Sequence, residues 1–161
     1  LGRSPLPGER VVAGLAKVVD VQCGYPYEPS TALFAQMSAR YCIAVALLDG
    51  AVLPDQFTDE RMASPDVCEL AQRIEIVGDD YLDSIYPEKY PGWVEVHTAN
   101  GIVREHRDNP SGAHDSPHFN TGLMSKYDAL LGQKGQALKA MILEAPPETP
   151  VRSIVQATAG K

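Results

Sequence analysis

The chain has 161 residues, a length that suits one domain. Hydrophobic residues make up 44% of it and charged residues 22%, which excludes a disordered or a fibrous chain. Acidic residues outnumber basic ones 21 to 14, and the resulting net charge of −7 repels a polyphosphate backbone. Because no cluster of lysines and arginines offsets this charge, we expect no nucleic acid as a partner.

Neither a membrane segment nor a disulfide framework is indicated. The longest apolar run extends from Cys42 to Leu48, well short of the roughly 20 residues that span a bilayer, so we expect no membrane partner. The cysteines, Cys23, Cys42 and Cys68, form no CxxC pair and no spacing typical of a metal site, and we interpret them as thiols of a cytoplasmic protein. Because the chain begins with Leu1 rather than methionine, we expect a piece of a longer chain or a processed subunit.

The N-terminal part predicts an arm, a strand and a long helix. The first residues contain prolines and glycines, which is typical of a linker. Residues 11–23 are apolar and β-branched, and residues 18–21 are the clearest strand among them. Ser30 is a suitable N-cap for a helix that extends to Asp49, where Gly50 can end it.

The middle of the chain predicts a second helix, a strand, a loop and a hairpin. Ser64 can cap a helix that begins with Pro65, and residues 74–77 after it are typical of a strand. Residues 79–91 predict a loop, because they are rich in Asp, Tyr and Pro.

The hairpin is predicted over residues 93–107, where two alternating segments flank the turn sequence Asn100-Gly101. The expected register places His97 opposite Arg104 as a surface cross-strand pair.

The C-terminal part predicts an exposed loop over residues 109–120 and then short helices. Those helices are expected over residues 123–131 and 136–143, followed by a last short element over residues 151–159. The order β-α-α-β-β-β-α-α predicts an α+β fold in which an antiparallel sheet has helices packed on one face.

Two histidines in the predicted loop, His114 and His118, are the first candidates for chemistry. Histidines four residues apart can share a metal ion when they lie on one face of a helix. Pro117 lies between them, however, and no third ligand has a diagnostic spacing, so we expect no metal and a loop that faces solvent or substrate. No P-loop, GxSxG or GxGxxG motif is present, and the residues taken singly supply no complete active site.

A longer block carries more information. The segment from Met37 to Gly50, MSARYCIAVALLDG, resembles the helix signature of the MmgE/PrpD family, which is roughly F-S-x-x-Y-x-x-A-x-A-L-x-x-G. The agreement continues in order over residues 57–74, the hairpin, Gly112, Pro117 and the Lys126-Tyr127 pair. It covers about residues 17–145 and resembles the C-terminal lid domain of the family.

The resemblance implies that this chain is the smaller of two domains found in the family's enzymes. The family includes 2-methylcitrate dehydratase, cis-aconitate decarboxylase and iminodisuccinate epimerase, which combine a larger helical domain with a smaller α+β lid. By this comparison residues 1–16 are a linker or arm, residues 17–145 the lid and residues 146–161 a tail. The resemblance implies that the helical domain lies on another segment or a separate subunit, that the enzyme forms a dimer or higher oligomer, and that it needs no cofactor.

The same resemblance assigns candidate residues on the long helix. Tyr41 matches the lid tyrosine that points into the substrate cleft, where a phenol can donate a hydrogen bond or a proton to an enolate-like species. The alternative is that Tyr41 belongs to the core, since it lies on the apolar stripe of its helix. Ser38 and Arg40 flank it as candidate substrate-binding residues. Arg40 would pair with a substrate carboxylate, or it is an ordinary surface arginine.

Gly112 and His114 are the substrate-binding candidates of the later loop. The family has a lysine before the glycine where this chain has Ser111, so the chain has either lost that lysine or replaced it with His114 or His118.

We therefore expect the lid domain or small subunit of a cofactor-independent lyase or isomerase that acts on small polycarboxylates. The sequence does not choose among dehydration, decarboxylation and epimerisation. The alternative is a non-catalytic binding or interaction module derived from the lid.

Overall fold

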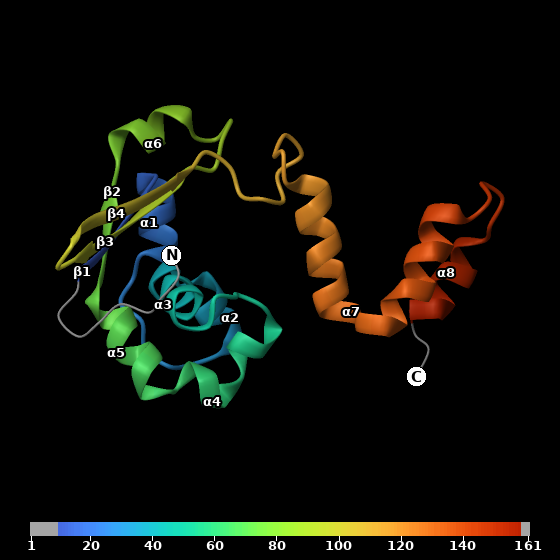
Figure 1. The fold of residues 1–161 in the computed structure, drawn as a ribbon, viewed down its shortest axis with the longest axis horizontal. Helices are drawn as coiled ribbons and strands as arrows, with labels where there is room; N and C mark the ends of the chain where they lie inside the picture. Colours follow the sequence, from blue (N-terminus) through green and yellow to red (C-terminus); the bar gives the residue numbers. More distant parts are fainter. Residues whose placement is uncertain (1–9, 159–161) are drawn as a thin grey trace. The chain divides into compact units, whose positions relative to one another are not determined.

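The computed structural model of the chain describes residues 10–158, apart from the side chains of residues 133, 134, 137, 157 and 158. It divides into two compact units, of which the first ends at Pro110 and the second begins at Ser111 (Figure 1). The elements of the first unit are β1 (Arg10–Leu15), α1 (Lys17–Cys23), α2 (Ala32–Met37), α3 (Ala39–Asp49), the 3₁₀ helix η1 (Pro54–Phe57), α4 (Asp59–Met62), α5 (Pro65–Arg73), β2 (Ile74–Gly78), α6 (Asp80–Ile85), β3 (Gly92–Thr98) and β4 (Gly101–Arg107). The elements of the second unit are α7 (Phe119–Glu144) and α8 (Val151–Thr158).

The first unit contains a sheet with the strand order β2-β1-β3-β4. β1 pairs antiparallel with β3, and β3 pairs antiparallel with β4. β1 and β2 are parallel, as the helical crossover that connects them requires. The predicted α+β class is confirmed, and the sheet is mixed but mostly antiparallel.

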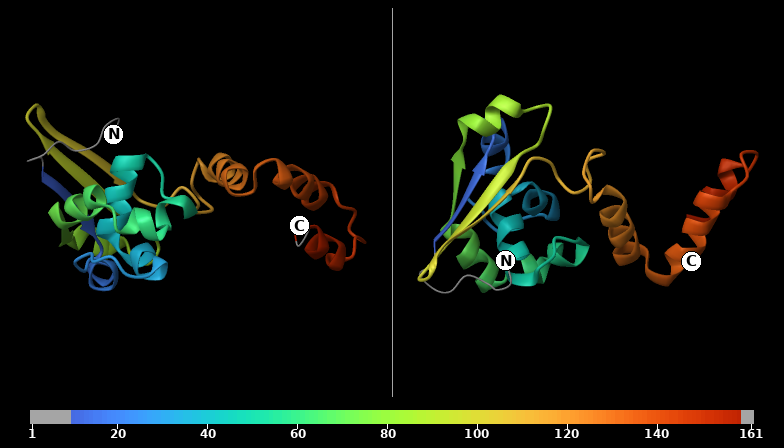
Figure 2. Two further views of the ribbon diagram at one scale, coloured as in Figure 1. Left: turned by 90° about the horizontal axis from the view of Figure 1, so that it is seen from below. Right: turned by 45° about the horizontal axis from the view of Figure 1, so that its top comes forward.

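Helices α3 and α5 cover one face of the sheet. Val11, Ile74 and Val96 on neighbouring strands belong to the same core cluster as side chains of both helices. The helical contributors are Tyr41, Ala44, Val45, Val67, Leu70 and Ala71. Figure 2 shows α2 to α5 gathered on one side of the sheet, so the predicted packing of helices on one face is confirmed for these helices.

The segment predicted as the clearest strand is a helix instead. Residues 18–21 lie in α1, and Val21 is 83% exposed. β1 is an inner strand of the sheet. It lies at the start of the apolar 11–23 segment, in residues that the family resemblance assigned to a linker or arm. β1 ends where Leu15 pairs with Gly78 and Gly92, so the chain leaves the sheet before the valines. Their β-propensity is a weak preference that this tertiary arrangement overrides.

The predicted long helix is two helices that meet at Ser38. Ser38 has a non-helical conformation, with φ −86° and ψ 113°, and its hydroxyl accepts a hydrogen bond from the N–H of Tyr41 at 3.2 Å. Serine favours such caps over helix interiors. Thr31, rather than Ser30, caps α2, whereas the predicted end at Gly50 is confirmed by its left-handed φ of 71°.

The hairpin is present in a different register. Its pairing begins with Thr98 opposite Gly101, so His97 faces Ile102 and not Arg104. Ala99 and Asn100 occupy the turn, and Gly101, with φ 121°, is already the first residue of β4. The partners change, but each side chain keeps its face of the sheet.

Predictions were also made for residues 79–91 and for the C-terminal helices. The predicted loop over residues 79–91 contains α6, which is capped by the side chain of Asp79. The break expected between the C-terminal helices is confirmed as a kink within α7 at Gly132, where φ is 52° and ψ is −143°. No helix among residues 10–158 is long and apolar enough to cross a membrane.

Candidate functional site

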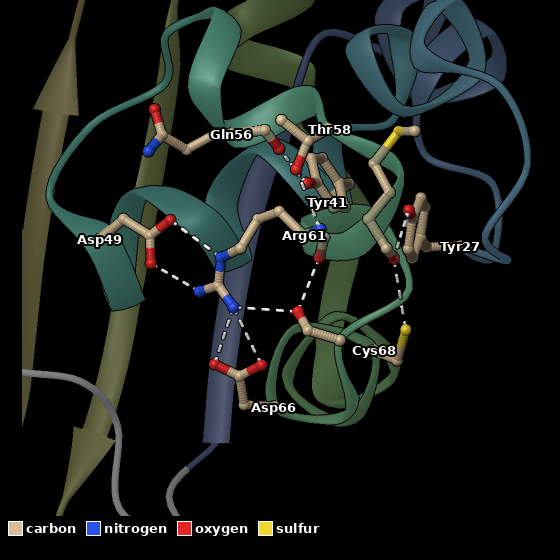
Figure 3. Close-up of polar contacts among 10 residues, drawn as sticks. Tyr27, Tyr41, Asp49, Gln56, Thr58, Arg61, Asp66 and Cys68 are labelled. Atoms are coloured by element: carbon tan, nitrogen blue, oxygen red, sulfur yellow. Dashed lines mark hydrogen bonds and ion pairs between the residues drawn. The ribbon is translucent and has the colours of Figure 1, made fainter.

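Tyr41 lies in the core of the first unit, with its ring beside that of Tyr27 (Figure 3). Its ring centroid is 4.7 Å from that of Tyr27 and 5.6 Å from that of Phe57. Its hydroxyl donates a hydrogen bond to the backbone carbonyl of Gln56 in η1. The side chain is fully buried, so the structure of this unit supports the core interpretation of Tyr41.

The chemistry of the phenol agrees with this placement. Burial raises the pKa of Tyr41 above 10.0, although the nearby charge of Arg61 works in the opposite direction. The hydroxyl therefore stays protonated at neutral pH, and its proton is held by Gln56. Tyr27 is similar, because its hydroxyl donates to the carbonyl of Met62 at 3.0 Å and burial raises its pKa. Tyr27, in the loop before α2, is thus tied to α4, and Tyr41, in α3, is tied to η1.

Ser38 and Arg40 also have partners inside the protein. Ser38 is buried and caps α3. Arg40 is half-buried, and its Nε donates to the carbonyl of Gly24 at 3.1 Å while its Nη1 donates to the carbonyl of Ile74. Arg40 thus connects the start of α3 to the end of α1 and to the start of β2. The structure groups Ser38, Arg40 and Tyr41 in one helical turn, and each has a structural contact there.

A cluster that the sequence analysis missed lies beside Tyr41 and is formed by Asp49, Arg61, Ser64 and Asp66, here called the Arg61 cluster (Figure 3). Arg61 binds Asp49 with two hydrogen bonds, Nε to Oδ2 at 3.0 Å and Nη2 to Oδ1 at 2.5 Å. Its Nη1 contacts both carboxylate oxygens of Asp66 at 3.0 Å and the hydroxyl of Ser64 at 2.9 Å. The Arg61 side chain is only 22% exposed.

The ionisation of the Arg61 cluster is fixed. The hydrogen bonds that Arg61 donates to Asp49 raise the pKa of Arg61, and burial only partly opposes them. Burial also acts against the charged form of Asp66, but hydrogen bonds from Arg61 and Ser64 hold its pKa below 3.8. Carboxylates of the protein already occupy this guanidinium, so the cluster is suited to fastening α3, α4 and α5 rather than to binding a substrate carboxylate. No short sequence pattern could have found it, because Asp49 and Arg61 lie on different helices.

The face of the sheet opposite α3 and α5 carries a second polar group, centred on Trp93. Its indole Nε1 donates to Asp79 Oδ2 at 2.8 Å. The guanidinium carbon of Arg104 lies 4.1 Å from the ring centroid, a cation–π contact. Arg104 also donates to Glu95 Oε1 at 2.8 Å, and the other Glu95 oxygen lies 3.2 Å from Nε2 of His97. The charges of this group are paired with one another.

Gly112 and His114 belong to the second unit, in the turns before α7. Both are exposed, and a Cβ added to Gly112 would meet no atom within 4 Å. His118 occupies the N-cap position of α7. Within residues 10–158, no three His, Cys, Asp or Glu side chains are grouped so that they could hold a metal ion.

Comparison with known proteins identifies one family. The family model of the MmgE/PrpD C-terminal domain matches residues 8–145, which include every element from β1 to α7. No curated protein matches the chain.

Proposed function

Because the chain belongs to the MmgE/PrpD family, we propose that it is the lid domain or small subunit of a cofactor-independent lyase or isomerase that acts on small polycarboxylates. The match to the C-terminal domain of a multidomain family supports a partner, which we propose is a helical domain on another segment or a separate subunit. A dimer or higher oligomer of that enzyme is part of the same proposal.

The observation that carries this proposal is the apolar surface of the second unit. Large apolar side chains project into solvent from both of its helices, and Leu143 is 69% and Val151 71% exposed. The others are Leu123, Leu130, Leu131, Met141, Ile142 and Val155. An exposed apolar surface of this kind is typical of an interface. Helices with so little buried surface gain their stability from tertiary packing, so a partner that covers these side chains is part of the proposal.

The polar groups of the first unit also support the proposal that this chain acts together with a partner. Dehydration, decarboxylation and epimerisation of a polycarboxylate all develop negative charge next to a carboxylate, which cations and hydrogen-bond donors stabilise. Arg40 and Arg61 donate to acceptors of the protein itself, and Tyr41 donates to Gln56. We therefore propose that the partner supplies most of the chemical groups. The lid contributes the exposed His114 beside Gly112, and Tyr41 contributes only if its bond to Gln56 is released.

The composition of the native assembly tests whether a helical partner is present. The intact mass of the protein isolated from its source is expected to show a longer chain, or this chain together with a helical one. Assays of that assembly with 2-methylcitrate, cis-aconitate and iminodisuccinate then test the substrate class. Turnover of at least one of them is expected, and His114→Ala is expected to raise KM, with His106→Ala as a matched control on an exposed histidine of β4. A native chain that is free of partners, or an assembly that converts no polycarboxylate, contradicts the enzyme and favours an interaction module.

A further inference from the structure

The turn of the hairpin carries a pair of residues, Asn100 and Gly101, that the proposed function does not use. Both are exposed, and they lie where the turn after β3 meets the first residue of β4. The main-chain nitrogen of Gly101 and the side-chain carbonyl carbon of Asn100 are separated by the atoms of a five-membered ring. The amide can therefore react with that nitrogen when both groups are accessible.

The nitrogen of Gly101 is unhindered. A Cβ added to this residue would meet no atom within 4 Å, so no neighbouring group covers this side of the turn. The glycine has φ 121°, a conformation that residues with a Cβ rarely adopt. Gly101 and Thr98 form the last pair of the β3–β4 ladder, and the ends of such elements open at the lowest free-energy cost.

The side-chain amide of Asn100 is free to rotate toward this nitrogen. The hydroxyl of Thr98 accepts a hydrogen bond from the main-chain N–H of Asn100 at 3.1 Å and donates one to the carbonyl of Gly101 at 2.9 Å. These two bonds hold the main chain of the turn. Among residues 10–158, no partner holds the Asn100 side chain itself.

The two other asparagines of the chain, Asn109 and Asn120, lack this combination. Asn109 precedes Pro110, which has no N–H, and its side-chain oxygen accepts a hydrogen bond from the N–H of Tyr90 at 3.0 Å. Asn120 lies in the first turn of α7 and precedes Thr121, whose β-branched side chain crowds its own nitrogen. Only Asn100 combines a free amide with an open glycine nitrogen.

We propose that Asn100 is a site of spontaneous deamidation in the folded protein. The Gly101 nitrogen loses its proton to hydroxide and attacks Cγ of Asn100. A bond forms between these two atoms, the bond from Cγ to Nδ2 breaks, and the amide nitrogen leaves as ammonia with a proton from water. A second water then opens the cyclic succinimide at one of its two carbonyl carbons, which gives aspartate or isoaspartate. In sum, one water is consumed and one ammonia is released, without oxidation or reduction.

The modification changes the tip of the hairpin. Either product adds one negative charge, and isoaspartate also adds one main-chain carbon atom to the connection between β3 and β4. Because residues 99–101 are exposed and lie outside the core cluster, the fold should persist after the change. This inference does not depend on the proposed activity.

Incubation of the full folded chain in mildly alkaline and in mildly acidic buffer tests the proposal. Peptide mapping is expected to find a mass increase of about 1 Da, from the exchange of an amide NH₂ for a hydroxyl, in the peptide that contains Asn100. Because the nitrogen must lose its proton, this product should accumulate faster in the alkaline buffer, and fragmentation should find isoaspartate at position 100.

The chain supplies its own controls. The peptides that contain Asn109 and Asn120 should keep their mass over the same incubation. Asn100→Gln should remove the modification, because the longer side chain would have to close a six-membered ring, and Trp93 fluorescence checks that this variant folds. An Asn100 peptide that stays unmodified in alkaline buffer, or equal modification at Asn109 or Asn120, overturns the proposal.

Discussion

Asp79 accepts a hydrogen bond from the indole Nε1 of Trp93 at 2.8 Å and caps α6 with its other carboxylate oxygen. That oxygen lies 2.8 Å from the N–H of Tyr81 and 3.2 Å from the N–H of Leu82. One side chain thus determines both where α6 begins and how the only tryptophan of the chain is oriented on the sheet.

Replacement of the Asp79 carboxylate should lower the stability of the fold. Asp79→Ala removes a helix cap and leaves the indole N–H without its acceptor, so we expect a loss of about 2 kcal/mol in the free energy of unfolding. Denaturant unfolding monitored by Trp93 fluorescence measures it. Asp80→Ala is the matched control, since its ion pair with Lys17 is exposed and should contribute little. Equal losses in the two variants would show that the cap and the indole bond do not act as described.

The same carboxylate predicts a pH dependence. The hydrogen bond from Trp93 holds the pKa of Asp79 below 3.8, although burial acts in the opposite direction. A carboxyl whose pKa is lower in the folded state stabilises the fold above its unfolded pKa and loses that contribution as the pH falls through the folded value. The difference in stability between the wild type and Asp79→Asn should therefore be largest above pH 3.8 and shrink below it. A difference that stays constant into strong acid would contradict the assignment.

Gly14 is required by the close approach of Trp93. A Cβ at this position would lie 2.1 Å from Cε2 of the indole, so Gly14→Ala must displace the ring together with its contacts to Asp79 and Arg104. We expect a loss of about 2 kcal/mol, in the range of overpacking substitutions, and a red shift of Trp93 emission. Gly112→Ala, where the added Cβ meets open space, should change neither quantity. An unshifted emission spectrum for Gly14→Ala would refute the predicted contact.

Tyr41→Phe separates the structural and the catalytic roles of this residue. The change removes only the hydroxyl and its hydrogen bond to Gln56, so we expect a loss of about 1 kcal/mol in stability and no change in kcat in the assembled enzyme. Tyr27→Phe, which removes the equivalent bond to Met62, is the matched control. Thermal melting and steady-state kinetics of both variants decide the question. A fall of about 100-fold in kcat for Tyr41→Phe alone would identify a transition-state donor.

The Arg61 cluster predicts a further loss of stability. Arg61→Met leaves Asp49, whose side chain is 22% exposed, and Asp66, which is 53% exposed, without their shared cation, and we expect a loss of about 2 kcal/mol. Arg107→Met removes an ion pair whose arginine is 75% exposed and should cost less than about 0.5 kcal/mol. Urea unfolding of the two variants compares them directly, and similar values would show that the cluster does not fasten the helices.

The sequence predicted correctly those structural features that are determined by a few neighbouring residues. The hairpin, the helix start at Pro65, the helix end at Gly50 and the kink at Gly132 follow from a few adjacent residues, and each is present. Ser64 occupies the N-cap position before Pro65, but its hydroxyl bonds to Arg61 and makes no cap hydrogen bond. The segment of Val18 to Val21 was predicted wrongly as a strand, because its secondary structure depends on where β1 leaves the sheet.

The candidate site was less predictable for the same reason. Arg40 finds its acceptors in Gly24 and Ile74, and Arg61 finds Asp49, all of which are distant in the sequence. The residue types at these positions are compatible equally with substrate binding and with internal support. Only the packed structure distinguishes the two.

The central claim is that this chain completes an active site whose remaining groups come from a helical partner. The measurement that tests it most directly compares turnover of 2-methylcitrate, cis-aconitate and iminodisuccinate by the purified 161-residue chain and by its native assembly at equal concentration of lid. The account predicts no turnover by the chain alone and turnover of at least one substrate by the assembly. Turnover by the chain alone would contradict it.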